Sequence, residues 1–211
     1  MSDIKLIGFD LDGTLITNNS WNDLNRAMGI TFEEDEAMHQ AHLMGDLVYE
    51  EWLGRLAFLY KKHGRASREN ITNSLNEYYL RDGVRETIAT LKARGYQTVV
   101  VSGASDLMIE IIKNDLGLDY AFTNNTFVFN DEDFLSDIKT LGLDTTAKEV
   151  LLRSLCVNLH IDITECIYVG DGHNDLGIFQ ATGQGVTFKG TVIEDKAWKV
   201  IDNFVELLDL V

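Results

Sequence analysis

The chain has 211 residues, of which 45% are hydrophobic, and a formal net charge of −16. This composition is typical of a globular protein with one substantial core, whereas the acidic charge argues against nucleic acid or an anionic membrane as a partner. We expect no membrane span and no targeting leader, because no apolar run has the required length or flanks. We interpret Cys156 and Cys166 as buried free thiols of a cytoplasmic protein, because they lack metal-ligand spacing.

The first predicted element is a buried strand that ends at two carboxylates. Residues 4–9 form an apolar run, and Asp10 and Asp12 follow it. Gly13 and Thr14 come next and predict a loop. Ligands of open parallel α/β sheets bind beyond the carboxyl ends of the strands. Two carboxylates this close repel each other, which indicates that a cation binds beside them.

The next stretch, residues 17–81, predicts helices in series. Apolar residues recur there at helical spacing, and no strand pattern lies among them. One of the helices has a capping-box pattern formed by Thr31 and Glu34. The expected helices begin near Ser20, Thr31, Val48 and Ser67.

From residue 82 onwards, predicted helices alternate with β-branched strands, which predicts an α/β fold with a doubly wound parallel sheet. Residues 17–81 are too many for one crossover connection. We therefore expect a helical cap domain inserted into a catalytic core of residues 1–16 and 82–211. The expected elements of the core are strands at 97–101, 120–122, 166–169 and 185–188, a hairpin of 127–129 and 134–138, helices at 84–93, 107–116, 145–155 and 176–181, and a helical tail.

Polar clusters stand at the ends of three predicted strands. Because the carboxyl ends of parallel strands meet at one edge of a sheet, we expect these clusters to lie together. Lys148 lies near the start of the helix that precedes the strand at 166–169. The clusters are Asp10, Asp12 and Thr14; Ser102 and Gly103; and Asp171, Asn174 and Asp175.

These clusters resemble the four motifs of the haloacid dehalogenase superfamily of phosphohydrolases. DLDGT at 10–14 is similar to the first motif, VVVSG at 99–103 to the second, Lys148 to the third and GDGHND at 170–175 to the fourth. All four occur in the family's order, each at a predicted strand end or helix start. The resemblance spans the chain and implies phosphomonoester hydrolysis on an α/β core with a helical cap.

The resemblance also implies a role for each motif residue. Asp10 would be the nucleophile that forms an aspartyl-phosphate, and Asp12 would be first the general acid and then the general base. Lys148 and the Ser102 hydroxyl would hold the phosphoryl oxygens. The further phosphate-binding candidates are Thr14, Gly103 and Asn174.

A charge count indicates why such a site needs a metal. The four motif aspartates and Lys148 leave the site strongly negative before a phosphate of about −2 arrives. Mg²⁺ suits the site, because it takes carboxylates, water and a phosphate oxygen as ligands. The resemblance implies ligation by the carboxylates of Asp10 and Asp171 and the carbonyl of Asp12, with Asp175 either a ligand or directly behind one.

Within the superfamily, the helical cap and the GDGHND motif most resemble the phosphoserine-phosphatase-like group. Two substrate contacts of that group differ here. Asn19 stands where the group has a glutamate for the substrate ammonium, and Leu56 stands where it has an arginine for the carboxylate. Arg55 precedes Leu56 directly, but successive side chains of a helix point about 100° apart around its axis. We therefore expect a small phosphorylated metabolite other than phosphoserine, with Asn19 and Arg55 as candidate contacts.

Two alternatives stay open at this point. The same aspartyl-phosphate could pass its phosphoryl group to an acceptor other than water, and the sequence does not separate the two reactions. A catalytically retired binding protein is disfavoured, because all the motif residues are intact.

We interpret Trp21 and Trp52 as core residues of the cap rather than as a stacking platform. The sequence leaves the oligomeric state open.

Overall fold

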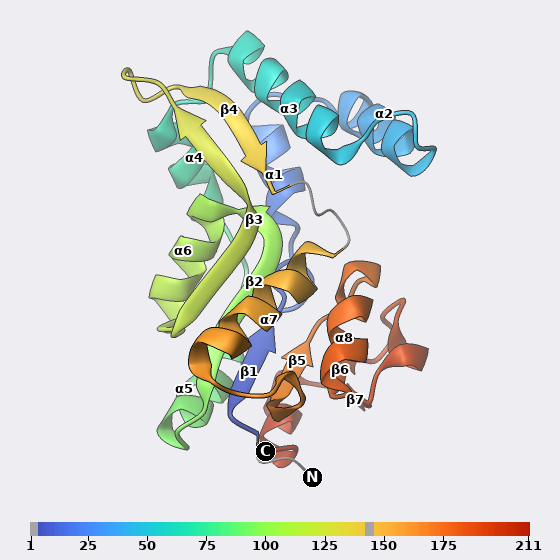
Figure 1. The fold of residues 1–211 in the computed structure, drawn as a ribbon. Helices are drawn as coiled ribbons and strands as arrows, with labels where there is room; N and C mark the ends of the chain where they lie inside the picture. The colour runs from blue at the N-terminus through green and yellow to red at the C-terminus, as the bar shows by residue number, and fades with distance from the viewer. Residues whose placement is uncertain (1–3, 142–145) are drawn as a thin grey trace.

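A seven-stranded sheet forms the centre of the protein in the computed structural model, which describes residues 4–141 and 146–211 (Figure 1). The strand order is β4-β3-β2-β1-β5-β6-β7. Every pairing is parallel except that of β4 with β3, which confirms the doubly wound α/β fold. The strands are β1 (Leu6–Phe9), β2 (Gln97–Ser105), β3 (Tyr120–Phe129), β4 (Leu135–Thr140), β5 (Cys166–Val169), β6 (Gly185–Phe188) and β7 (Lys199–Ile201).

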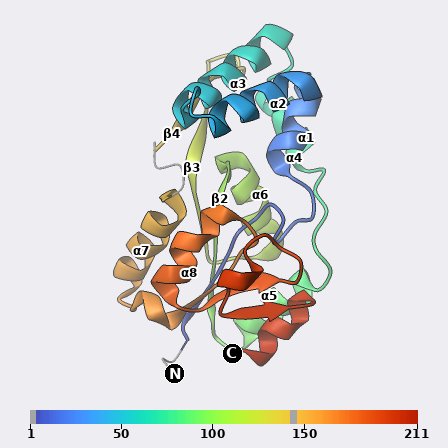
Figure 2. The same ribbon diagram turned by 90° about the vertical axis from the view of Figure 1, so that its right-hand side faces the viewer.

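Helices cover both faces of this sheet, with α5 and α6 on one side and α7 and α8 on the other (Figure 2). Their bounds are α5 (Val84–Ala93), α6 (Asp106–Leu116), α7 (Ala147–Leu159) and α8 (Leu176–Thr182). Short 3₁₀ turns span Ile163–Glu165, His173–Asp175, Glu194–Lys196 and Phe204–Asp209. The remaining helices, α1 (Ser20–Ala27), α2 (Phe32–Leu43), α3 (Tyr49–His63) and α4 (Arg68–Leu75), follow β1 in the chain.

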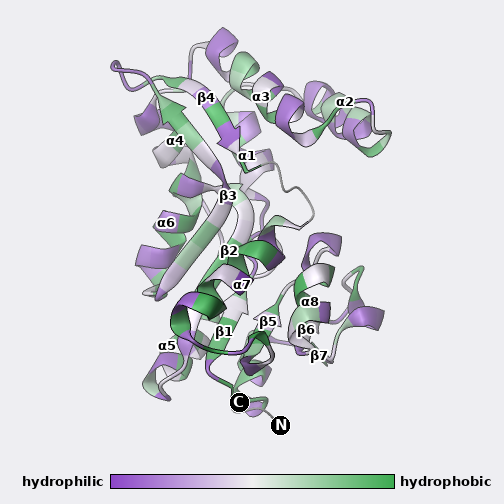
Figure 3. Cartoon of the chain, viewed as in Figure 1, coloured by the Kyte–Doolittle hydropathy of each residue, from purple (hydrophilic) through white to green (hydrophobic). Residues whose placement is uncertain are grey.

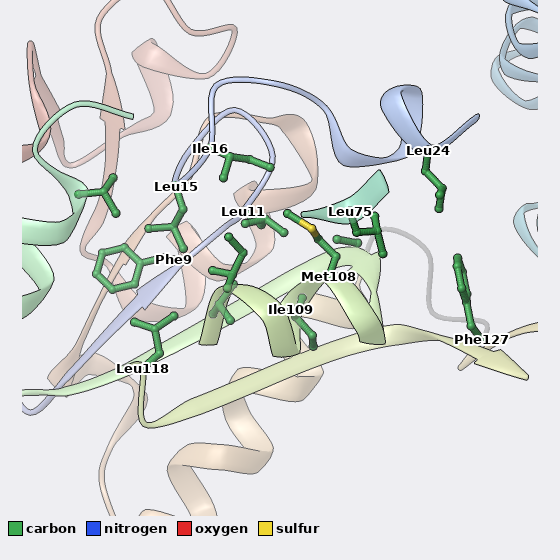
Figure 4. Packing of buried hydrophobic residues seen from close by; sticks show 14 of the residues in the cluster. Phe9, Leu11, Leu15, Ile16, Leu24, Leu75, Met108, Ile109, Leu118 and Phe127 are labelled. Atoms are coloured by element: carbon green, nitrogen blue, oxygen red, sulfur yellow. The ribbon is translucent and has the colours of Figure 1, made fainter. Parts of the chain in front are cut away.

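Alternate residues of the central strands supply two hydrophobic clusters, one on each face of the sheet. Ile7 and Phe9 of β1 belong to the cluster under α5 and α6, whereas Leu6 belongs to the cluster under α7 and α8. Burial on both faces explains why these strands are so hydrophobic (Figure 3). The first cluster continues beyond the sheet to Leu24 of α1 and Leu75 of α4, so the core and the α1–α4 segment share one apolar interior (Figure 4).

The four predicted helix starts agree with the structure, in which α1 begins at Ser20, α2 at Phe32, α3 at Tyr49 and α4 at Arg68. The capping box is present, because the Thr31 amide donates to Glu34 Oε2 at 2.9 Å and the Glu34 amide donates to Thr31 Oγ1 at 3.2 Å. Ser67 caps α4 by accepting from the Asn70 amide at 3.1 Å. Asn19 caps α1, so the cap does not use the side chain of Ser20, the first residue of the helix. Ser20 is left free to bind elsewhere.

Three expectations for the core need correction or completion. The predicted strands at 120–122 and 127–129 are parts of one continuous strand, β3, because Asn125 inside it still pairs with β2 and β4. The tail is not simply helical, since β7 adds a parallel strand to the sheet edge. The predicted helix start at residue 145 lies outside the described residues, and α7 begins at Ala147.

The chain leaves and re-enters the core through two segments that pair with each other. The Thr17 amide donates to the Tyr79 carbonyl at 2.8 Å, and the Arg81 amide donates to the Leu15 carbonyl at 2.9 Å. Helices α1–α4 lie beyond the carboxyl end of β1, and the β3–β4 hairpin extends alongside α3 and α4 (Figure 1). Lys61 of α3 donates to the Ser136 carbonyl of that hairpin at 2.9 Å. No helix within residues 4–141 and 146–211 has the length and hydropathy to cross a bilayer.

The start of β6 is packed too tightly against α8 for a side chain at Gly185. A Cβ there would lie 2.1 Å from the Phe179 ring. We expect Gly185→Ala to lower the free energy of unfolding by about 1–3 kcal/mol, because overpacking forces neighbours to move. Gly54→Ala is the matched control, since α3 has open space at Gly54, and it should stabilise the protein by about 0.5–1 kcal/mol. Urea denaturation measures both, and equal stability of the two variants would contradict this packing.

Candidate active site

The buried ammonium of Lys148 joins two of the predicted site aspartates. Its Nζ lies 2.8 Å from Asp10 Oδ2 and 2.7 Å from Asp175 Oδ1, and all three side chains are at most 7% exposed. Burial alone would lower the pKa of Lys148, but the charges of Asp10 and Asp175 outweigh it and raise that pKa above its usual range. Lys148 is therefore charged at neutral pH and fixes the end of β1 relative to α7 and the loop after β5.

Asp175 also holds the loop in which it lies. Its Oδ2 accepts hydrogen bonds from the amides of Asp171 and Gly172, both at 3.0 Å. Burial raises the pKa of Asp175 to about 6, against the opposing effect of Lys148. Both carboxylate oxygens of Asp175 are thus already engaged by protein groups.

Asp171 lies against the first motif. Its Oδ1 accepts a hydrogen bond from the Thr14 hydroxyl at 3.0 Å, and burial, followed by the charge of Asp10, raises its pKa. Gly13 makes this approach possible, because a Cβ on Gly13 would lie 2.2 Å from Asp171 Oδ2 and the residue has a φ of +75°. The first and fourth motifs therefore meet as the sequence predicted.

Asp12 is bound by the first residue of the α1–α4 segment. Its Oδ1 accepts from the Ser20 amide at 2.8 Å and its Oδ2 from the Ser20 hydroxyl at 2.9 Å. Burial raises the pKa of Asp12 to about 7, with a contribution from the charge of Asp10, although the Ser20 hydrogen bonds oppose the shift. A carboxyl group with this pKa can both give and take a proton near neutral pH.

The second motif forms another wall of the site. Ser102 is buried, and its Oγ accepts from the Ala104 amide at 3.2 Å. The carbonyl of Gly103 accepts from Trp21 Nε1 at 2.9 Å and from Asn125 Nδ2 at 2.6 Å. The backbone of the motif is thereby fixed from both the α1–α4 segment and β3.

These residues surround a cavity of about 300 Å³, which we call the phosphate cavity. A second cavity of about 550 Å³, the cap cavity, lies among α1, α2 and α3. Asn19, Trp21 and Tyr49 line both cavities, which places the two side by side. The phosphate cavity is lined by Asp10, Asp12, Ser102, Lys148, Asp171 and Asn174, among others. The cap cavity is lined in part by Trp21, Phe32, His39, Tyr49, Trp52 and Leu56.

The two candidate substrate contacts of the sequence analysis have different positions. Asn19 lines both cavities, and its Oδ1 accepts from the Asn22 amide at 2.9 Å as the cap of α1. Arg55 is exposed on α3 and is absent from the lining of either cavity. Leu56, one residue later, is buried and lines the cap cavity. The structure therefore does not bring Arg55 to the site.

The donor set fits a divalent cation. Carboxylate oxygens of Asp10, Asp171 and Asp175 lie within 4.8 Å of one another. Asp10 Oδ1 is buried without a hydrogen-bond partner in the described residues, which is costly for a carboxylate unless a cation or ligand binds it. Hard oxygen donors around such an orphaned carboxylate form a metal-ion site.

Comparison with known proteins agrees with this geometry. The haloacid dehalogenase-like hydrolase profile matches residues 4–183. The chain belongs to this family. It is 32% identical over 194 residues to the phosphoserine phosphatase of Methanocaldococcus jannaschii, an alignment that covers 92% of this chain and 90% of that protein. Four further curated relatives are longer, and the alignments span 49–65% of their lengths.

Solved structures of phosphoserine phosphatases share the whole fold of this haloacid dehalogenase-like hydrolase. A substrate-bound complex superposes with a TM-score of 0.81 at 29% identity, and a phospho-aspartyl intermediate analogue with a TM-score of 0.80 at 30% identity. Each match covers 100% of both chains. These relatives identify the chain as a phosphatase of the family, which confirms the resemblance seen in the sequence.

The sequence analysis missed several residues that position this hydrolase's site. The sequence indicated Ser20 only as the start of a helix, but it also binds the Asp12 carboxylate. Arg81 donates to the carbonyls of Gly13 and of Thr14, the latter at 3.1 Å. Asn125, inside a strand, holds the Gly103 carbonyl. Asn125 lies between two strands predicted from the sequence and therefore looked like a loop residue, and Arg81 carried no signal.

The pKa of Asp12 predicts a pH-dependent stability difference. Because the folded pKa of about 7 exceeds the model-compound value of 3.8, the native state binds this proton more tightly, and stability is lost as the pH rises towards 7. Asp12→Asn cannot ionise and keeps an acceptor for the Ser20 amide. Its stability relative to wild type should therefore increase by on the order of 2 kcal/mol between about pH 5.5 and about pH 8.

Urea unfolding in EDTA at the two pH values measures this difference. Asp46→Asn is the control, because Asp46 is exposed in the α1–α4 segment and should show no such change. A constant stability difference between Asp12→Asn and wild type at both pH values would mean that Asp12 has an ordinary pKa.

Proposed function

We propose that this phosphatase hydrolyses a small phosphorylated metabolite in a Mg²⁺-dependent reaction with Asp10 as the nucleophile. The observation that carries the proposal is the state of the Asp10 carboxylate. Lys148 fixes Oδ2, while the buried Oδ1 has no partner in the described residues. An oriented carboxylate of this kind, at the wall of the phosphate cavity, suits attack on a phosphorus atom.

In the first step, an Asp10 oxygen would form a bond to phosphorus while the bond between phosphorus and the ester oxygen breaks. Asp12, protonated in part because its pKa is about 7, would give its proton to the departing alcohol. In the second step, Asp12 would take a proton from water as that water attacks phosphorus. The aspartyl-phosphate bond then breaks, and inorganic phosphate and the Asp10 carboxylate are regenerated.

Other residues of the phosphate cavity would hold the transferring group. The Lys148 ammonium and the Ser102 hydroxyl would bind phosphoryl oxygens, and the Gly103 backbone would approach them closely. Asn174 lines the same cavity and would bind phosphate. Thr14 would act indirectly, because its hydroxyl is already directed to Asp171.

The metal would be held by the carboxylates of Asp10 and Asp171 with the Asp12 carbonyl. When bound, Mg²⁺ would offset the charge of the carboxylates and the phosphate. Asp175 is better suited to a positioning role, because Lys148 and two loop amides occupy both of its oxygens. We propose Mg²⁺ rather than a softer metal because every candidate donor is an oxygen.

The α1–α4 segment would act as a cap domain of residues 17–81 that covers the substrate. The pairing of Thr17 with Tyr79 and of Leu15 with Arg81 supports these boundaries. Phosphoserine phosphatases are the named relatives, but α3 places no arginine at either cavity, because Leu56 lines the cap cavity and Arg55 faces outward.

Two buried thiols support a reducing, cytoplasmic location. No observation favours phosphotransfer to another acceptor, so hydrolysis is the function proposed.

Asp10→Asn tests the chemistry. Without the nucleophile, hydrolysis of 4-nitrophenyl phosphate in Mg²⁺ should fall by about 10³-fold or more, and EDTA should abolish the wild-type activity. Asp46→Asn, with an exposed carboxylate in the α1–α4 segment, should keep full activity. Retained activity in Asp10→Asn would remove Asp10 as the nucleophile, and activity in EDTA would remove the metal.

Arg55→Ala tests whether Arg55 takes part in substrate binding. Because Arg55 is exposed and outside both cavities, KM for O-phosphoserine should stay within about twofold of wild type. Steady-state kinetics measures this directly. An increase of about tenfold or more in KM would show that the cap brings Arg55 to the substrate.

A further inference from the structure

The cap cavity is larger than a phosphorylated amino acid requires. Its volume is about 550 Å³, and it adjoins the phosphate cavity through the shared lining of Asn19, Trp21 and Tyr49. The phosphate cavity, at about 300 Å³, already has the room for a phosphate and a few further atoms. A substrate as short as phosphoserine would leave the cap cavity to water. Its lining therefore reports on the alcohol part of a longer substrate.

Aromatic rings form much of this lining. Trp52 lies with its ring centroid 5.9 Å from that of His39 and 6.4 Å from that of Tyr49, the latter edge to face. Trp21 stands at the junction of the two cavities, where its bond to the Gly103 carbonyl fixes the indole. Rings fixed in this way offer flat apolar faces to a bound group. The interpretation of Trp21 and Trp52 as core residues alone is incomplete, since both line the cavity.

The charged groups of the cap cavity are largely satisfied by one another. Arg26 pairs with Asp35 and donates to the Ile30 carbonyl at 2.6 Å. Asn25 donates to Asp35 at 3.0 Å and accepts from the Tyr60 hydroxyl at 2.5 Å. Among the described residues that line the cavity, Arg26 is the one arginine or lysine.

The remaining charge at this cavity is negative. Glu36 also lines it, and Asp35 already neutralises Arg26. Glu36 is exposed and accepts from Gln40 Nε2 at 2.7 Å, so it gives only a weak, solvent-screened preference against a second anionic group. The preference applies to an alcohol with a net negative charge and not to serine, whose ammonium offsets its carboxylate; the apolar rings are what favour an uncharged group.

We propose that the substrate is a phosphomonoester whose alcohol carries an uncharged aromatic or other planar apolar group that lies in the cap cavity. The phosphate would lie in the phosphate cavity beside Asp10 and Lys148, and the planar group would lie among Trp21, Tyr49 and Trp52. The inference rests on the proposed function of the phosphate cavity, and it assigns selectivity to the cap.

A substrate panel tests the assignment with 2-naphthyl phosphate, O-phosphoserine and phosphocholine. We expect kcat/KM for 2-naphthyl phosphate to exceed that for O-phosphoserine by about 100-fold, which is the selectivity that an apolar pocket achieves. An equal or higher value for O-phosphoserine overturns the proposal. A preference for phosphocholine would overturn it too, because the aromatic rings would then bind a cation rather than an uncharged group.

Phe32→Ser provides the structural arm of the test, with Phe58→Ser as its matched control. Phe32 lines the cap cavity and is 68% exposed, so its loss leaves the fold intact, and Phe58 is 63% exposed outside both cavities. Phe32→Ser should raise KM for 2-naphthyl phosphate by about tenfold without changing KM for acetyl phosphate. Phe58→Ser should change neither. Equal effects of the two variants contradict the role of the cavity.

Calorimetric binding to Asp10→Asn separates this proposal from the proposed function. If the wild type hydrolyses acetyl phosphate but Asp10→Asn binds 2-naphthyl phosphate no better than O-phosphoserine, the phosphatase chemistry stands and the cap inference fails. If no phosphate compound is hydrolysed, the proposed function fails. Tight binding of 2-naphthyl phosphate that Phe32→Ser weakens would in that case still support the assignment of the cap cavity.

Discussion

A lysine ammonium buried between two carboxylates is the interaction on which the site depends. Lys148 connects the end of β1, through Asp10, with the loop after β5, through Asp175. Ionised groups are costly to bury, and the arrangement is favourable only because opposite charges meet at hydrogen-bonding distance. Removing the lysine would leave carboxylates buried side by side. The same pairing that fixes the strands' ends therefore sets the electrostatics of the phosphate cavity.

The rest of the site is built outward from this ion bridge. Asp175 holds the amides of Asp171 and Gly172, and Asp171 in turn accepts the Thr14 hydroxyl. The Asp175 contacts are local to the loop after β5, whereas the bond between Thr14 and Asp171 joins two motifs that are far apart in the chain. The result is a rigid set of oxygen donors whose negative charge exceeds what Lys148 supplies. A divalent cation would offset this excess negative charge and would allow a phosphate to bind beside the carboxylates.

The sequence predicted the parts of the protein that local patterns determine. Strand ends with clustered polar residues, capped helices and the order of the four motifs all depend on residues close together in the chain. The orientation of α3 also follows from a local pattern: Leu56 recurs at helical spacing with the other apolar residues of the helix and is buried, so Arg55 faces solvent. The continuity of β3 depends instead on distant residues. Asn124 and Asn125 look like a loop in the sequence, and only the pairing with β2 and β4 makes them part of a strand.

The roles of Ser20 and Arg81 show the same limit within the site. Both stand at the junction of the α1–α4 segment with the sheet, and only the folded chain brings them to the first motif. Ser20 is the more consequential, because its amide and hydroxyl are the groups that bind the Asp12 carboxylate. They favour the ionised form, whereas burial favours the protonated form and prevails.

The proton affinity of Asp12 is thus set jointly by the loop after β1, which supplies the residue, and by α1, whose Ser20 binds it. A change in the position of α1 would alter both effects at once. It would weaken the Ser20 hydrogen bonds, which raises the pKa of Asp12, and admit water, which lowers it. Selection of the substrate by the cap and protonation of the leaving group would then depend on the same helix, since Trp21 of α1 also lines both cavities.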